Sequence, residues 1–303
     1  MRALLVLSVL AVAMLAATGC GDRSSSGDAQ VSAVATTTQV ADLVGEVGGK
    51  RVAVERILEP NSDPHGYEPR PSDAAAIAEA DIVFRSGGDL DEWLSDLVEN
   101  AGGDAPTVDL IDSVELRDED PHWWQDPRNT IAAVAAIEAA LTEADPSGEA
   151  TYRQNARAYV AELRRLDRAV SECIALIPAE QRRLVTTHDA LGYYADRYRL
   201  RVVGALIPSL STAAQPSAGD IEALVDQIER QDVKAIFPES SLNPKLEQAV
   251  SRETGARVGR ALWADTLGSS GSSGETYVES IQSNTEAIVD GLTGGAERCR
   301  PAV

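Results

Sequence analysis

The chain contains three histidines, and each lies in a short polar segment whose residue types could hold a metal ion. His65 lies in NSDPHGYEP, His122 in DPHWWQDP and His188 in TTHDALGYY. Neutral imidazole is a common ligand of Zn²⁺ and of other divalent transition metals. Asp265, in ALWADTLG, would complete a tetrahedral set of three imidazoles and one carboxylate. The residue types therefore suggest one metal site with four protein ligands.

Two of the three histidines follow an Asp-Pro pair. Proline fixes its own φ and favours an extended conformation in the preceding residue, so each of these histidines is expected to project from a stiff turn. Asp63 and Asp120 could accept a hydrogen bond from an imidazole ring and so set its tautomer. Asp126 and Asp189 are equally well placed in the sequence to do this, and the sequence does not rank the four.

Three further residues near these segments have more than one interpretation. Trp123 and Trp124 are more typical of packing, although they could also form a wall of the site. Glu239, in FPES, is interpreted as a carboxylate near the start of a helix, and the alternative is a reserve metal ligand. A single loop histidine is usually solvated surface, so the argument depends on all three occurring together.

Short β-branched runs alternate with amphipathic runs along the chain, which predicts parallel sheets flanked by helices. The expected fold is α/β, with two lobes that each contain a parallel sheet and are joined by a long backbone helix. The lobes are assigned to residues 31–145 and 179–298, and the linking helix to 146–178. Predicted strands cover 31–36, 51–58, 81–87, 106–111, 182–188, 200–206, 233–240 and 256–262. Predicted helices cover 37–49, 72–80 with Ser72 as the cap, 90–103, 126–145, 189–198, 217–231, 243–255 and a last one after 275.

Each candidate ligand follows a predicted strand, two in each lobe. Functional loops of parallel sheets gather at the carboxyl ends of the strands. We therefore expect His65, His122, His188 and Asp265 to converge in the cleft between the lobes.

The first twenty residues, MRALLVLSVLAVAMLAATGC, are typical of an export signal. Arg2 precedes a short apolar run, and small residues lead to Cys20. The ending resembles a bacterial lipoprotein signal, so residues 1–19 are predicted to be removed and Cys20 to carry lipid. Residues 20–30 are small and polar, which predicts a flexible tether. The protein is therefore expected outside the cytoplasm, anchored to the bacterial cell membrane.

The chain has 303 residues and a formal net charge of −21, which disfavours binding to nucleic acid. Two cysteines remain after Cys20. Export allows a disulfide between Cys173 and Cys299, although the sequence cannot supply the geometry. The Gly-Ser run LGSSGSSGE after Asp265 is predicted to be mobile.

Five segments in order resemble the zinc and manganese solute-binding lipoproteins of bacterial ABC importers. They are LEPNSDPHGYEPRPSD, AEADIVFRSGGDLDEWL, DPHWWQDPRN, VTTHDALGYYADRY and the Asp of LWADTLG. The resemblance spans about residues 31–295. It implies two α/β lobes joined by a rigid helix and holding one ion between them. It also implies His65 and His122 as ligands from the first lobe, and His188 and Asp265 from the second.

The resemblance further implies that the protein delivers its ion to a membrane permease that works with an ATPase, and we expect a monomer. Manganese-type members of this family often have Glu at the position of His188. Imidazole suits Zn²⁺ and carboxylate suits Mn²⁺, so zinc is the predicted cargo. Binding of Mn²⁺ or Fe²⁺ by the same scaffold is one alternative. A zinc hydrolase, in which Asp265 leaves a coordination position to water, is another.

Overall fold

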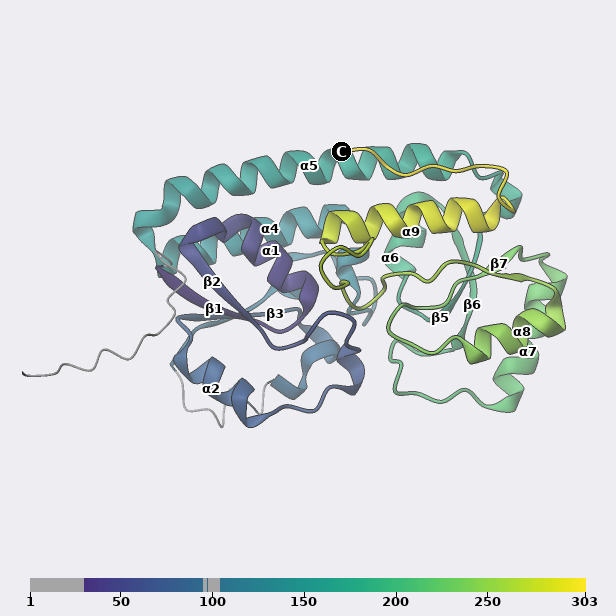
Figure 1. Ribbon diagram of the computed structural model, residues 1–303, viewed down its shortest axis with the longest axis horizontal. Helices are drawn as coiled ribbons and strands as arrows, with labels where there is room; N and C mark the ends of the chain where they lie inside the picture. Colours follow the sequence, from purple (N-terminus) through teal and green to yellow (C-terminus); the bar gives the residue numbers. More distant parts are fainter. Residues whose placement is uncertain (1–29, 95–96, 98–103) are drawn as a thin grey trace, which may run out of the picture.

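The computed structural model describes residues 30–94, 97 and 104–303, which form two α/β lobes side by side beneath one long helix (Figure 1). The predicted signal peptide, Cys20 and the tether up to residue 29 lie outside the described residues. Most of the helix predicted at 90–103 also lies outside them. Among the described residues, no helix combines the length and apolar character needed to cross a membrane.

The first lobe is built on a parallel sheet of four strands in the order β2-β1-β3-β4. The strands are β1 (Val31–Ala35), β2 (Val52–Arg56), β3 (Ile82–Arg85) and β4 (Thr107–Asp109). Helices α1 (Thr38–Gly48) and α2 (Pro71–Glu79) belong to this lobe.

Ser72 does not cap α2, so that prediction is wrong. Pro71 begins the helix, since its fixed φ and missing N–H suit the first helical position. The Asp73 carboxylate then accepts the backbone N–H of Arg70 at 2.7 Å.

The second lobe also contains only parallel strand pairs among its described residues. They are β5 (Arg183–His188) with β6 (Arg201–Ile207), and β7 (Ala235–Ile236) with β8 (Arg257–Val258). A bridge between Thr186 and Phe237 joins the two pairs. The helices are α6 (Gly192–Tyr198), α7 (Ala218–Arg230) and α8 (Lys245–Thr254).

Strands β7 and β8 are shorter than the predicted 233–240 and 256–262. Pro238 has no N–H to donate to a ladder, so regular pairing stops before it. Only the isolated bridge between Glu239 and Leu262 continues the alignment.

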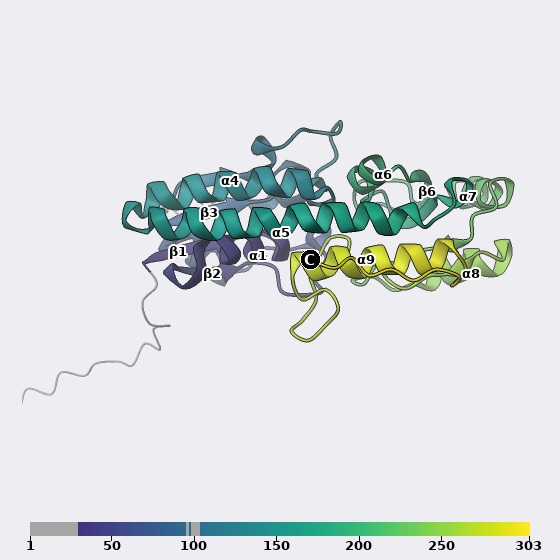
Figure 2. The same cartoon turned by 90° about the horizontal axis from the view of Figure 1, so that it is seen from above.

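Three long helices cover the two lobes: α4 (Pro127–Ala144), α5 (Glu149–Ala175) and α9 (Tyr277–Leu292). Figure 2 shows α5 lying beside α4 over the first lobe and beside α9 over the second. With 27 residues, α5 is about 40 Å long. Its predicted apolar stripe is confirmed as buried, and the stripe comprises Tyr152, Ala156, Tyr159, Leu163, Leu166, Val170 and Ile174.

Near the end of α5, Cys173 is joined by a disulfide to Cys299 in the C-terminal tail, with 5.4 Å between the two Cα atoms. From Cys299 the last residues run back toward the middle of the molecule, and Figure 1 shows them lying beside α5.

Asp42 of α1 lies where α9 meets the first lobe, and burial raises its pKa from 3.8 to about 7. The backbone N–H of Tyr277 opposes this shift, and nearby Glu46 and Glu279 add to it. The folded state thus binds this proton more tightly than the unfolded state. The stabilisation is complete below about pH 4 and is lost as the pH rises to about 7.

Replacing Asp42 with Asn keeps an acceptor for Tyr277 and removes the charge. We expect this variant to gain on the order of 2 kcal/mol of unfolding free energy at pH 8, and almost nothing at pH 4. Urea unfolding across this pH range measures the change. Asp226→Asn, at an exposed site on α7, is the control. A loss of stability that is equal at every pH would contradict the assignment.

Candidate metal centre

The four predicted ligands each end a strand or lie in the segment that follows one, and they meet between the two lobes. His65 lies on a 3-10 turn after β2, and His122 lies in the loop after β4. His188 is the last residue of β5, and Asp265 follows β8. One nitrogen or oxygen atom from each side chain lies within 4.8 Å of those of the other three. The structure thus brings the four residues together.

The Asp265 carboxylate lies close to all three imidazoles. Its Oδ2 is 3.3 Å from Nε2 of His65 and 3.1 Å from Nε2 of His188. Its Oδ1 is 3.4 Å from Nε2 of His122, and the Nε2 atoms of His122 and His188 are 3.3 Å apart. Two ligands about 2.0–2.1 Å from a tetrahedral Zn²⁺ would be about 3.3 Å apart. The spacing therefore suits four donors around one small cation.

The cluster is buried, and several of its atoms lack conventional partners. The side chains of the four residues are exposed by 5% or less. Within the described part of the chain, Nε2 of His65 and both carboxylate oxygens of Asp265 have no hydrogen-bond partner. Leaving buried polar atoms unpaired is costly, so their convergence here points to a bound cation that satisfies them.

The two DPH motifs form the same turn. In each motif the aspartate carboxylate accepts the backbone N–H of the histidine two residues later. This hydrogen bond is 3.0 Å long from Asp63 to His65 and 3.0 Å from Asp120 to His122. Such turns are a common use of aspartate before proline. The turn fixes the backbone from which each imidazole projects.

Carboxylates hold two of the imidazoles with the Nε2 atom facing the cluster. Nδ1 of His122 lies 2.7 Å from Asp120, and Nδ1 of His188 lies 2.5 Å from Glu239. These contacts favour the tautomer with the proton on Nδ1, which leaves Nε2 free to coordinate. For His188, the carboxylate that accepts the ring hydrogen bond is Glu239 and not Asp189.

Two of the other three aspartates that could have accepted a ring hydrogen bond have different partners. Asp63 bonds the hydroxyl of Thr212 from the opposite lobe at 2.6 Å. Asp126 caps α4 and pairs with Arg128. Asp120 is therefore the one of the four sequence candidates that contacts a ring.

The structure gives Glu239 a different role from the one predicted from the sequence. It is only 4% exposed, and α8 begins six residues later, so it is not a carboxylate at a helix start. Its bonds to both the backbone N–H and the ring of His188 depend on the alignment of β7 with β5. No local sequence signal encodes that alignment.

Electrostatic interactions couple the Asp265 carboxylate to the imidazoles around it. Burial alone would raise the pKa of Asp265, but His188 and His122 outweigh burial and hold that pKa well below its usual range. Burial would likewise lower the pKa of His188, but Asp265 and Glu239 raise it well above the ordinary value.

The paired tryptophans are buried, and they both pack in the core and form a wall of the site. Trp123 is completely buried and donates its indole N–H to the carbonyl of Ser86. Trp124 packs its ring 5.4 Å from that of His122 and donates to the carbonyl of Ala264 at 3.0 Å. Trp124 thus forms a wall of the cluster and contacts the residue next to Asp265.

Two α/β lobes, a rigid helix across both and a buried donor set at their seam define a two-lobe metal-binding protein. A family model described as "Zinc-uptake complex component A periplasmic" matches residues 33–291, and the chain belongs to this family. Its members are substrate-binding proteins of metal ABC importers and are not enzymes. The chain is therefore a metal ABC transporter substrate-binding protein, and the hydrolase alternative is wrong.

Similar proteins carry different metals in their names. The manganese-binding lipoprotein MntA of Bacillus subtilis is 34% identical, covering 96% of this chain and 100% of that protein. The iron-binding protein YfeA of Yersinia pestis is 28% identical, covering 96% of each chain. The structure of the periplasmic zinc binding protein TroA from Treponema pallidum superposes with a TM-score of 0.82. It is 29% identical and covers 87% of this chain and 99% of that one.

Proposed function

We propose that this protein captures Zn²⁺ through His65, His122, His188 and Asp265 and delivers it to a membrane permease. The observation that carries the choice of metal is the buried contact between His188 and Glu239. A carboxylate that accepts a hydrogen bond from residue 188 favours an imidazole there. Three imidazoles and one carboxylate suit Zn²⁺ better than Mn²⁺.

The proposal includes the way the protein is held at the membrane. Removal of residues 1–19 would leave Cys20 to carry lipid, and residues 20–30 would tether the binding domain. Residues 31–145 and 179–298 would form the two lobes, with 146–178 between them. The names of the lipoprotein relatives support the anchor. Labelling by a radioactive fatty acid that disappears in a Cys20→Ala variant tests it.

The metal is tested by elemental analysis of protein purified from its own host, followed by titration of Zn²⁺ against Mn²⁺. We expect about one zinc per chain and displacement of manganese by zinc at equal concentrations. Manganese in the native protein would overturn the choice of zinc. The manganese-binding relatives make this the second candidate, and the four proposed ligands would then bind Mn²⁺ instead.

Zinc affinity should fall as the pH falls, because metal must displace protons from imidazole. The pKa of His188 is raised above its ordinary value by Asp265 and Glu239. We therefore expect the decline to begin above the usual imidazole range and to continue as the pH falls through about 6.5. Competition with a chelator whose own protonation is known measures this. An affinity that stays constant from pH 8 to 5 would exclude imidazole ligands.

A further inference from the structure

The chain leaves the second lobe just before Asp265. The N–H of Leu262 donates to the carbonyl of Pro238 at 2.8 Å, and its carbonyl accepts from Ser240 at 2.9 Å. Trp263 exchanges two hydrogen bonds of 2.8 Å with the side chain of Asn284. Residues 262 and 263 are therefore fixed to second-lobe strand and helix segments.

At Ala264 and at Leu267, on either side of Asp265, the backbone forms hydrogen bonds with first-lobe residues. The carbonyl of Ala264 accepts from Nε1 of Trp124 at 3.0 Å and from Nε2 of Gln125 at 2.9 Å. The N–H of Leu267 donates to Oγ1 of Thr38 at 2.8 Å. Asp265 thus lies between two points of attachment, and both lead to the first lobe.

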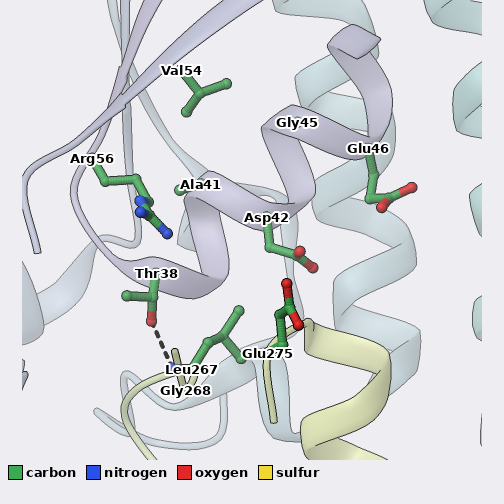
Figure 3. A pocket seen from close by; sticks show the side chains of 10 residues that line it. All are labelled: Thr38, Ala41, Asp42, Gly45, Glu46, Val54, Arg56, Leu267, Gly268 and Glu275. Atoms are coloured by element: carbon green, nitrogen blue, oxygen red, sulfur yellow. Dashed lines mark hydrogen bonds between the residues drawn. The ribbon is translucent and has the colours of Figure 1, made fainter. Parts of the chain in front are cut away.

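Each side chain that makes these attachments is buried and oriented. Thr38, Trp124 and Gln125 are exposed by 3% or less. The hydroxyl of Thr38 donates to Oε1 of Gln39 at 3.0 Å, which leaves its lone pair for the N–H of Leu267. Figure 3 shows this last hydrogen bond at the edge of a cleft between α1 and the loop that carries Leu267 and Gly268.

The Gly-Ser run after Leu267, which the sequence predicts to be mobile, forms a loop closed by hydrogen bonds. The N–H of Gly268 donates to the carbonyl of Gly274 at 2.7 Å, and the N–H of Gly271 donates to Glu275 at 2.7 Å. A Cβ on Gly274 would lie 2.4 Å from the indole of Trp263, so only glycine fits this close approach.

The loop leads into α9, whose first residue is also attached to the first lobe. The N–H of Tyr277 donates to Asp42 at 3.0 Å, and its hydroxyl donates to the carbonyl of Trp124 at 2.7 Å. The first-lobe attachments therefore continue from Ala264 to Tyr277, on both sides of the Asp265 carboxylate.

We propose that Thr38 and Gln125 are positioning residues that make Asp265 move with the first lobe, although the chain reaches it from the second. This inference rests on the proposed role of the four residues as metal ligands. Release then separates His188 from His65, His122 and Asp265, which stay together. The lobes would divide the ligands three to one rather than two to two.

Thr38→Val keeps the branched shape and removes the acceptor, leaving the N–H of Leu267 unpaired. We expect zinc release into excess chelator, followed by stopped flow, to become about 5- to 50-fold faster, as for loss of one buried hydrogen bond. The visible absorption of the Co²⁺ form should shift, because Asp265 coordinates in a looser geometry. Thr38→Ser restores the acceptor and should bring both measurements back toward those of the original protein.

Thr293→Val makes the same chemical change at the distant end of α9 and should leave release unchanged. If Thr38→Val does not fold, Gln125→Met provides the same test at the carbonyl of Ala264. Release and Co²⁺ spectra that match the original protein in both variants would overturn the inference. Such a result leaves the metal site intact, whereas failure of the original protein to bind metal would refute the proposed function instead.

A metal-free crystal structure distinguishes directly between a three-to-one and a two-to-two division of the ligands between the lobes. We expect Asp265 to superpose with the first lobe when the lobes are aligned separately, and His188 to move away from it. Displacement of Asp265 together with His188 would contradict the three-to-one division.

Discussion

Replacing His122 with alanine is expected to weaken zinc binding by roughly 10²- to 10³-fold. Structural zinc sites bind with about 10–16 kcal/mol, so one ligand of four contributes about 3 kcal/mol, and each 1.4 kcal/mol is a factor of ten. His122 is fully buried, and its ring is held by Asp120, so no neighbouring solvent-exposed group can readily take its position. Competitive titration against a chelator of known affinity measures the loss.

The matched control is Glu119→Ala, which removes an exposed side chain from the same loop. It should bind zinc as the original protein does, because its side chain is directed to solvent rather than into the cluster. Thermal unfolding with and without zinc gives an independent readout, since a ligand that binds only the folded state raises its stability. A His122→Ala protein that keeps the original affinity would remove this residue from the proposed ligand set.

The convergence of the four candidate ligands could be predicted because it follows from topology. Parallel strands place their carboxyl ends at one edge of a sheet, and His65, His122 and His188 each follow or end a strand. The apolar stripe of α5 has a strict spacing of three and four residues, so its burial was equally predictable. In both cases, the local sequence pattern is enough to predict where the residues lie.

The hydrogen bonds that position the ligand residues could not be predicted in the same way. Glu239 reaches His188 across 51 residues, and Leu267 reaches Thr38 across 229. These contacts depend on how strands align and how the two lobes pack, and neither property leaves a periodic pattern. The short lengths of β7 and β8 had a visible cause in Pro238, but its effect depends on which neighbour the strand pairs with.

The contact of Glu239 with His188 predicts how the site responds when residue 188 becomes a carboxylate. In His188→Glu, two buried carboxylates would face each other where a ring N–H now donates to Glu239 at 2.5 Å. Their repulsion should weaken binding of both Zn²⁺ and Mn²⁺, by roughly 100-fold for zinc. This variant alone would therefore not become a good manganese site.

Adding Glu239→Gln supplies an amide donor to the new carboxylate and removes the repulsion. We expect the double variant His188→Glu, Glu239→Gln to recover manganese binding and to narrow the preference for zinc over manganese by about tenfold or more. A carboxylate in place of an imidazole also lowers the net charge of the occupied site from +1 to 0. Titrations of both metals on the two single variants and the double variant measure the coupling between the residues.

If the effects of the two substitutions simply add, Glu239 supports the fold of the second lobe without influencing the metal. If they do not add, the choice of metal depends on a pair of residues, of which only one is proposed to touch the ion. Neighbouring residues in direct contact commonly show coupling of 0.5–3 kcal/mol, so the distinction is measurable. A coupled result would explain why position 188 cannot by itself set the preference between zinc and manganese.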